Sequence, residues 1–242
     1  MKNENDIVVD AIRNSCTLVT FGTHKWQPMK TDANLAVEVK KSKSATGKAV
    51  STKVNLANGF EHLLSGVTRV MSRAYHTHIR MTVPWGEGQR LLPNLQLVEY
   101  MQEMQGHRAA LDKAKAELLT RLPSAIQQAI VNNADLGDIR DYPEPHIIAD
   151  TFDYEWDFAP VSDVAGFAGL PEGFRERFES NYQHKVGTLL DEGVNDVKDR
   201  LRGLIGKWRS VLTSSKPKFF QSTIDNIAQL GTTLANLNIT QA

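Results

Sequence analysis

Thr82-Val-Pro-Trp-Gly-Glu-Gly-Gln-Arg-Leu-Leu-Pro93 is the stretch that decides the fold, because it joins two helical patterns through an irregular connection. Its glycines permit positive φ, and Pro93 suits the first turn of a following helix. Pro84 drives Val83, the residue before it, into an extended conformation. The sequence therefore predicts a structural corner, or an anchor for a partner, that consists of Pro84, Trp85, Gly86, Glu87, Gly88 and Arg90.

Apolar residues recur at spacings of three and four on both sides of this corner, which is typical of amphipathic helices. Before the corner, the pattern predicts a helix over 58–77 with Asn58 as its N-cap. After it, the pattern predicts a long helix over 94–122 that stops or kinks near Pro123 and resumes over 125–134. We expect Trp85 to be the wedge between the first two of these helices.

A second long helix is predicted over 171–212, because apolar residues from Val186 to Val211 form one continuous stripe. A last amphipathic helix is predicted from 219 to 230. Two long helices cannot each bury such a stripe alone. We therefore expect the 94–122 and 171–212 helices to pack as an antiparallel hairpin.

The N-terminal part predicts a short helix over 6–13 and then strands, because its apolar residues are β-branched and alternate. The expected strands cover 18–26, 35–39 and 50–54, with a polar, lysine-rich hairpin tip between the last two. The predicted fold is thus mainly α with a small β portion: a long antiparallel helical hairpin plus an N-terminal region of short strands.

Two domains are expected, residues 1–57 and 58–242, and the second contains an acidic and aromatic connector at 135–170. This connector has two interpretations: an exposed partner-binding loop, or aromatic rings over the core with the acids facing water. Residues 31–80 carry a charge of +5 and residues 123–170 one of −8, although the whole chain is neutral. These opposite regions either pair with each other or make contacts between copies.

The lone cysteine, Cys16, lies in an apolar run, so a buried small hydrophobe is expected and no disulfide. The N-terminus lacks the order of a signal peptide, and no apolar run is long enough to span a membrane. We therefore expect a cytoplasmic location and no membrane partner.

The motifs of the common enzyme and cofactor classes are missing. Gly86 and Gly88 do not match a dinucleotide or phosphate loop, and His76 and His78 lack further zinc ligands of matching quality. No catalytic residue, cofactor or metal is predicted. An enzyme remains an alternative only if Trp85, Glu87 and Arg90 share a small pocket.

A second alternative is a protein that binds single-stranded nucleic acid. In it, the lysines of the hairpin tip contact phosphates, and Trp26 or Tyr75 stacks on bases. The same lysines equally suit a solvated tip that protects a sheet edge. The lysines concerned are Lys40, Lys41, Lys43, Lys48 and Lys53.

The order of several motifs resembles an uncharacterised family encoded by tailed bacteriophages and some bacteria. The motifs are Trp26-Gln-Pro-Met-Lys30, the 82–93 corner with Glu99-Tyr100 after it, Asp141-Tyr-Pro143, Phe158-Ala-Pro-Val161 and the terminal helix from Phe219 to Asn238. The resemblance implies a viral origin and a mostly helical fold, and it implies no reaction. We therefore expect a non-enzymatic helical protein that acts through protein partners or self-assembly.

Overall fold

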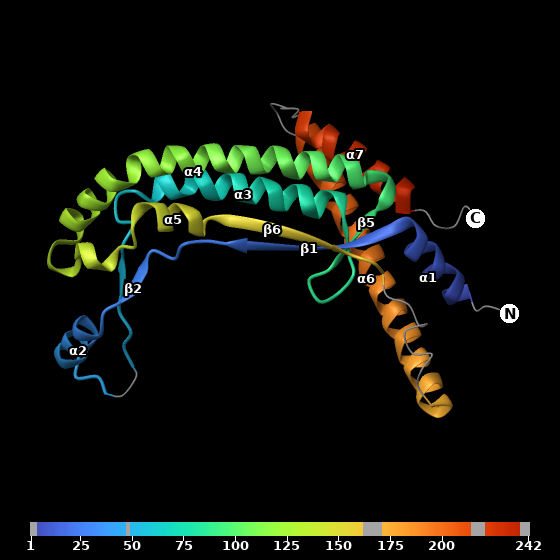
Figure 1. Cartoon of the computed structure of the whole chain (residues 1–242), viewed down its shortest axis with the longest axis horizontal. Coiled ribbons are helices and arrows are strands. Elements are labelled where there is room, and N and C mark those ends of the chain that lie inside the picture. The colour runs from blue at the N-terminus through green and yellow to red at the C-terminus, as the bar shows by residue number, and fades with distance from the viewer. Residues whose placement is uncertain (1–3, 47–48, 162–170, 214–220, 238–242) are drawn as a thin grey trace. The chain divides into compact units, whose positions relative to one another are not determined.

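The computed structural model describes residues 4–46, 49–161, 171–213 and 221–237 (Figure 1). Helices dominate, so the prediction of a mainly α fold with a small β portion is confirmed. The helices are α1 Glu4–Ser15, α2 Ala33–Ser42, α3 Glu61–Met81, α4 Leu97–Asn133, α5 Pro145–Thr151, α6 Glu172–Leu212 and α7 Gln221–Leu237, with 3-10 turns at Asn94–Gln96, Ala134–Leu136 and Ile139–Asp141. The strands are β1 Cys16–His24, β2 Met29–Thr31, β3 Lys53–Asn55, β4 Val83–Pro84, β5 Arg90–Pro93 and β6 Asp153–Ala159.

Contacts group the chain into two units, each made of segments that are distant in sequence. Unit 1 comprises Met1–Gly22, Tyr75–Met104 and Glu155–Ala242. Unit 2 comprises Thr23–Ala74 and Gln105–Tyr154. Helices α3 and α4 each contribute one end to unit 1 and the rest to unit 2.

Unit 1 is built on a sheet with the strand order β4-β5-β1-β6. Strands β1 and β5 pair antiparallel, with Cys16 opposite Pro93 and Val19 opposite Arg90. β1 confirms the predicted first strand, and Cys16 is buried with a raised pKa caused by that burial. Helix α6 lies against β4, α1 and α7.

Unit 2 is built on the long parts of α3 and α4, which lie side by side (Figure 1) and line a common groove. The chain reverses through β4 and β5 between them, so the two helices are antiparallel. Their facing stripes are buried, as the spacing of three and four predicts. The buried residues are Leu64, Val67 and Met71 from α3 and Leu111, Leu118, Leu122 and Ile126 from α4.

Two predictions about α4 need correction. The predicted stop near Pro123 is wrong, since the helix continues to Asn133 with Pro123 exposed and Leu122 and Ile126 buried. The alternative of a kink at Pro123 stays a prediction. Its antiparallel partner is α3, whereas α6 makes its contacts within unit 1. Apolar periodicity shows that a helix needs a partner, and it does not say which helix that is.

A predicted strand is also wrong. Residues 35–39 belong to α2, whose N-cap is Asp32: its carboxylate accepts a hydrogen bond from the Leu35 backbone N–H at 2.9 Å. Strand β3 pairs with β2, with Lys30 opposite Val54. The lysine-rich segment thus begins in the end of a helix and lies in the connection between β2 and β3, not in a hairpin formed by 35–39 and 50–54.

Three aromatic residues of the connector lie in the core of unit 2. Tyr142, Phe152 and Tyr154 are buried, which confirms the second interpretation for this part of the connector. Asp153 pairs with Arg108 of α4, whose guanidinium also lies 4.3 Å from the Tyr154 ring centroid. Residues 162–170 of the predicted connector lie outside the described residues.

Two acidic residues of the connector pair with lysines within unit 2. Lys30 contacts Asp141 at 2.7 Å, and Lys115 lies 3.8 Å from Asp150. The Asp141 carboxylate, as the main hydrogen-bond partner, raises the pKa of Lys30.

None of the helices in the described part of the chain is both long and apolar enough to cross a lipid bilayer.

Candidate functional site

The predicted corner is a tight β-hairpin between β4 and β5. The Trp85 N–H donates to the Gln89 carbonyl at 2.9 Å, and the Gln89 N–H donates to the Gly86 carbonyl at 2.9 Å. Between them, φ is +81° at Gly86, +52° at Glu87 and +78° at Gly88. Glycine adopts this left-handed region without strain, which explains why two of the three residues are glycine.

Trp85 is buried, with 7% of its surface exposed, so it is not a free binding surface. Its neighbours in the core cluster come from α1, β1 and α6, and they include Ile12, Leu18 and Leu189. The prediction that Trp85 packs as a wedge between the 58–77 and 94–122 helices is therefore wrong, because its buried neighbours belong to other elements. The tryptophan fastens the hairpin to α6 and to the start of the chain.

Glu87 and Arg90 use different partners. Glu87 is exposed and pairs with Lys185 of α6 at 2.9 Å, and this ion pair lowers the pKa of the Glu87 carboxyl. Arg90 donates from Nε to Thr82 Oγ1 at 2.7 Å and from Nη2 to the Thr82 carbonyl at 3.1 Å. The corner thus holds both charged side chains in structural contacts. Pro84, the last residue of β4, pairs with Arg90 in the hairpin ladder.

The end of α3 is closed by residues from far along the chain. Arg200 of α6 donates to the carbonyls of Ile79 at 2.7 Å and Thr82 at 2.9 Å. It also forms an ion pair with Asp196, which lies 3.9 Å from Arg90. The last carbonyls of a helix lack partners within the helix and carry partial negative charge, so a guanidinium is well suited to cap them.

His78 lies at the buried side of this helix end. Its Nδ1 is 3.0 Å from the hydroxyl of Tyr100, and its ring stacks on Phe21 with centroids 5.1 Å apart. Burial, with a smaller contribution from the Arg90 charge, lowers its pKa to about 4. The imidazole is therefore neutral at physiological pH. His76, two residues earlier, is exposed, so the two rings do not converge on one metal ion.

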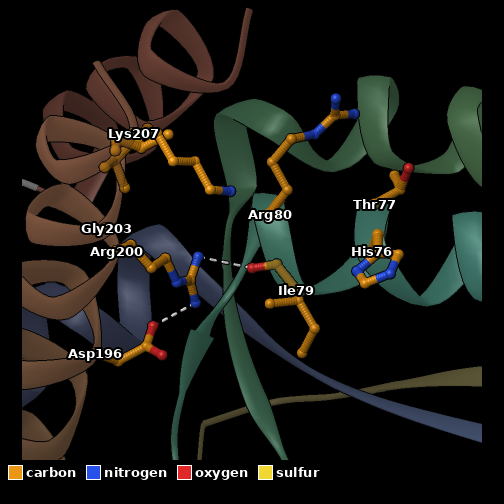
Figure 2. A pocket seen from close by; sticks show the side chains of 10 residues that line it. His76, Thr77, Ile79, Arg80, Asp196, Arg200, Gly203 and Lys207 are labelled. Atoms are coloured by element: carbon orange, nitrogen blue, oxygen red, sulfur yellow. Dashed lines mark hydrogen bonds and ion pairs between the residues drawn. The ribbon is translucent and has the colours of Figure 1, made fainter. Parts of the chain in front are cut away.

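Next to the Arg200 contacts lies an open cavity of about 520 Å³. Figure 2 shows residues of α3 on one side and residues of α6 on the other, with Lys207 reaching across toward α3. The sequence does not reveal this cavity, because more than 110 residues separate its two walls. The lining residues are His76, Thr77, Ile79 and Arg80 from α3, Asp196, Arg200, Gly203, Leu204 and Lys207 from α6, and Leu230 from α7.

The lysines predicted to bind nucleic acid do not lie on one hairpin. Lys40 and Lys41 are in the last turn of α2, Lys43 is its C-cap, and Lys53 begins β3. Lys48 lies outside the described residues. Trp26, one of the rings predicted to stack on bases, instead stacks on Phe60 with centroids 6.4 Å apart.

Within the described ranges, no three histidine, cysteine or acidic side chains lie together in a way that suits a metal ion. The geometry at the α3 end is thus that of a capped helix beside a cationic cavity. Comparisons of the chain with models of protein families, with curated proteins and with solved structures give no match.

Proposed function

We propose that this protein is a non-enzymatic, phage-type helical protein that self-assembles through an exposed apolar face of α6. One observation carries the proposal: four large apolar side chains between Val194 and Leu212 of this helix remain exposed in the structure. Their exposed fractions are 49% for Val194, 43% for Leu201, 59% for Ile205 and 64% for Leu212. Exposed apolar side chains that align along one helix are typical of a helix that packs against a partner.

The exposed residues are part of a longer pattern with the spacing of a coiled coil. Together with three residues that are only partly exposed, they follow one another at gaps of three or four residues. This apolar seam consists of Leu190, Val194, Val197, Leu201, Ile205, Trp208 and Leu212. It extends for about 33 Å at a rise of about 1.5 Å per residue.

Most contacts of α6 within unit 1 use a different side of the helix, and of the seam residues Leu190 packs against the cluster around Trp85. Val186 and Leu189 pack in the cluster around Trp85, and Arg200 caps α3. Leu230 of α7 and Leu204 line the same cavity. Since the internal contacts leave most of the seam exposed, the seam is available to a partner.

The partner that fits this surface is a second copy of α6 in the antiparallel direction. Lys198, Arg202 and Arg209 flank the seam on one side, and Asp191 lies on that same side nearer the N-terminus. A parallel pair would place this flank of one copy beside the opposite flank of the other, so Asp191 and Arg209 of two copies would not meet. An antiparallel pair centred on Leu201 brings Asp191 of one copy near Arg209 of the other.

The same register matches the apolar residues in size. Leu201 meets its own copy, Val194 meets Trp208 and Val197 meets Ile205. Arg202, which would otherwise face a basic residue, is already paired with Asp199 of its own helix at 2.9 Å. The contacts at the corner also favour a non-enzymatic role, because Glu87 and Arg90 are each held by a separate structural partner.

Light scattering and sedimentation over a range of protein concentrations test the proposal. The full chain should form a dimer, and the double variant Leu201→Glu, Ile205→Glu should remain monomeric at every concentration. Val131→Glu is the matched control, because Val131 is 72% exposed on α4 and lies outside the seam. A wild-type chain that stays monomeric throughout, or a double variant that still dimerises, contradicts the proposal.

Cysteine cross-linking tests the direction of the helices. The only native cysteine is buried, so an introduced surface cysteine is the main reactive thiol. Leu201→Cys should form a disulfide-linked dimer, whereas Val194→Cys should not, because its copies would lie about 21 Å apart along the pair. Equal cross-linking at both positions indicates a parallel pair and refutes the antiparallel arrangement.

A further inference from the structure

The cavity between α3, α6 and α7 has more positive charge than its own residues balance. Arg80, Arg200 and Lys207 line it, and Asp196 is the one acidic residue among its lining residues. Asp196 is already engaged by Arg200 and lies 3.9 Å from Arg90. The cavity therefore has a net positive charge.

Arg80 and Lys207 are the cations that remain available. In the described part of the chain, neither has an acidic partner, and the buried Nε of Arg80 has no hydrogen-bond acceptor. A buried N–H of a guanidinium without an acceptor is costly, and two cations beside one cavity repel each other. An anion bound beside them would remove the repulsion between the two cations.

The rest of the lining defines what kind of anion fits. Ile79, Leu204 and Leu230 contribute apolar surface, and His76 adds a ring with hydrogen-bonding nitrogens. The cavity of about 520 Å³ is much larger than one inorganic phosphate requires. These features suit a ligand with a charged phosphate at one end and a flat, partly apolar body at the other.

We propose that this cavity binds a phosphate group carried by a nucleotide, with Arg80 and Lys207 as the phosphate contacts. Arg200 holds the wall in place, because two carbonyls and Asp196 fix its guanidinium. Arg80 is near the end of α3, so this cap also positions Arg80. The same phosphate chemistry is offered by a free nucleotide and by a single-stranded oligonucleotide.

Calorimetric titration with three probes separates these sources: inorganic phosphate, AMP and a short single-stranded oligothymidine. We expect AMP to bind more tightly than inorganic phosphate. If the oligonucleotide is the preferred source, it should bind more tightly than AMP, and its affinity should fall with salt with a log–log slope of about −0.7 per phosphate contacted.

Lys207→Gln should weaken binding of AMP by about tenfold, and adding Arg80→Gln should weaken it by about tenfold again. Lys207 is exposed, so the single variant leaves the fold intact, and thermal unfolding of each variant checks this. Lys198→Gln is the matched control, because it removes a lysine of α6 that does not line the cavity.

Four outcomes overturn the proposal: no binding of any probe, equal affinity for AMP and phosphate, unchanged affinity in the double variant, or equal loss in the Lys198 control. The proposal does not depend on self-assembly. The seam variant Leu201→Glu, Ile205→Glu should bind AMP with unchanged affinity, so a failure of one proposal is distinguishable from a failure of the other.

Discussion

Replacement of Trp85 by alanine is the most direct test of how the β4–β5 hairpin is attached. The indole packs against α1, β1 and α6 with 7% of its surface exposed. A buried aromatic side chain removes about 150–250 Å² from water, which at about 25 cal/mol per Å² corresponds to about 4–6 kcal/mol. Alanine retains the Cβ contact, so we expect a loss of about 3–5 kcal/mol in the free energy of unfolding.

The local packing favours the upper part of this range. Trp85 already borders a cavity of about 230 Å³ that Tyr182 and Leu189 also line. Removal of the indole would enlarge that space, and the strands of the hairpin hold the surrounding backbone. The site therefore cannot collapse easily around the missing ring, and a cavity that persists adds to the cost of the lost burial.

Urea unfolding followed by circular dichroism measures this loss from the shift of the midpoint at an unchanged slope. Phe174→Ala is the control, since Phe174 is an aromatic residue of α6 with 62% of its surface exposed, and its truncation should cost less than about 0.5 kcal/mol. A loss below about 1 kcal/mol for Trp85→Ala would refute the assignment of Trp85 as the residue that fastens the hairpin.

Three further predictions concern the hairpin and the end of α3. Gly86→Ala and Gly88→Ala should both lower stability, since φ is positive at both; the loss should be larger at Gly86, where the new Cβ would lie 2.6 Å from Leu189 Cδ2 while nothing lies within 4 Å at Gly88. Equal midpoints in urea for the two variants would contradict this. Burial lowers the pKa of His78 from 6.5 to about 4, so the unfolded chain binds a proton at a higher pH than the folded chain does. The contribution of neutral, buried His78 to the free energy of unfolding is therefore complete above about pH 6.5 and is lost as the pH falls toward 4. Between pH 7 and pH 5 this group should cost about 2 kcal/mol, and His78→Gln should lack that part of the pH dependence in unfolding measured at both pH values. Arg200→Gln should cost about 1–3 kcal/mol, because it removes the guanidinium donor from the Ile79 carbonyl and leaves the Thr82 carbonyl with Arg90 alone, whereas Arg202→Gln on the exposed side should change the midpoint little; similar midpoints would show that the Arg200 cap contributes nothing.

Sustained periodicity made much of this fold predictable. The regions now seen as α3, α4, α6 and β1 were expected from spacing alone, and the burial of Cys16 followed from its apolar surroundings. Short segments were less informative. Residues 35–39 alternate like a strand, but the Asp32 cap makes them helical, and a cap of this kind needs only one side chain.

The site could be predicted only in part. The corner could be predicted because the conformational preferences of glycine and proline act locally and do not depend on distant residues. The residues of α6 that contact the corner and the end of α3 could not be predicted. Arg200 and Thr82 are 118 positions apart, and an arginine on an amphipathic helix looks the same whether it caps another helix or faces water.

The long separation between α3 and its cap has a consequence for synthesis on the ribosome. At about 5–20 residues per second, Arg200 follows Thr82 after about 6–24 s. β1 and β5 can pair much earlier, because both are complete once Pro93 has been made. The Ile79 carbonyl near the end of α3 thus stays without its arginine cap until Arg200 has been made, whereas Arg90 can reach the Thr82 carbonyl earlier. A nascent chain that stalls within α6 before Arg200 would have its sheet in place and the end of α3 frayed.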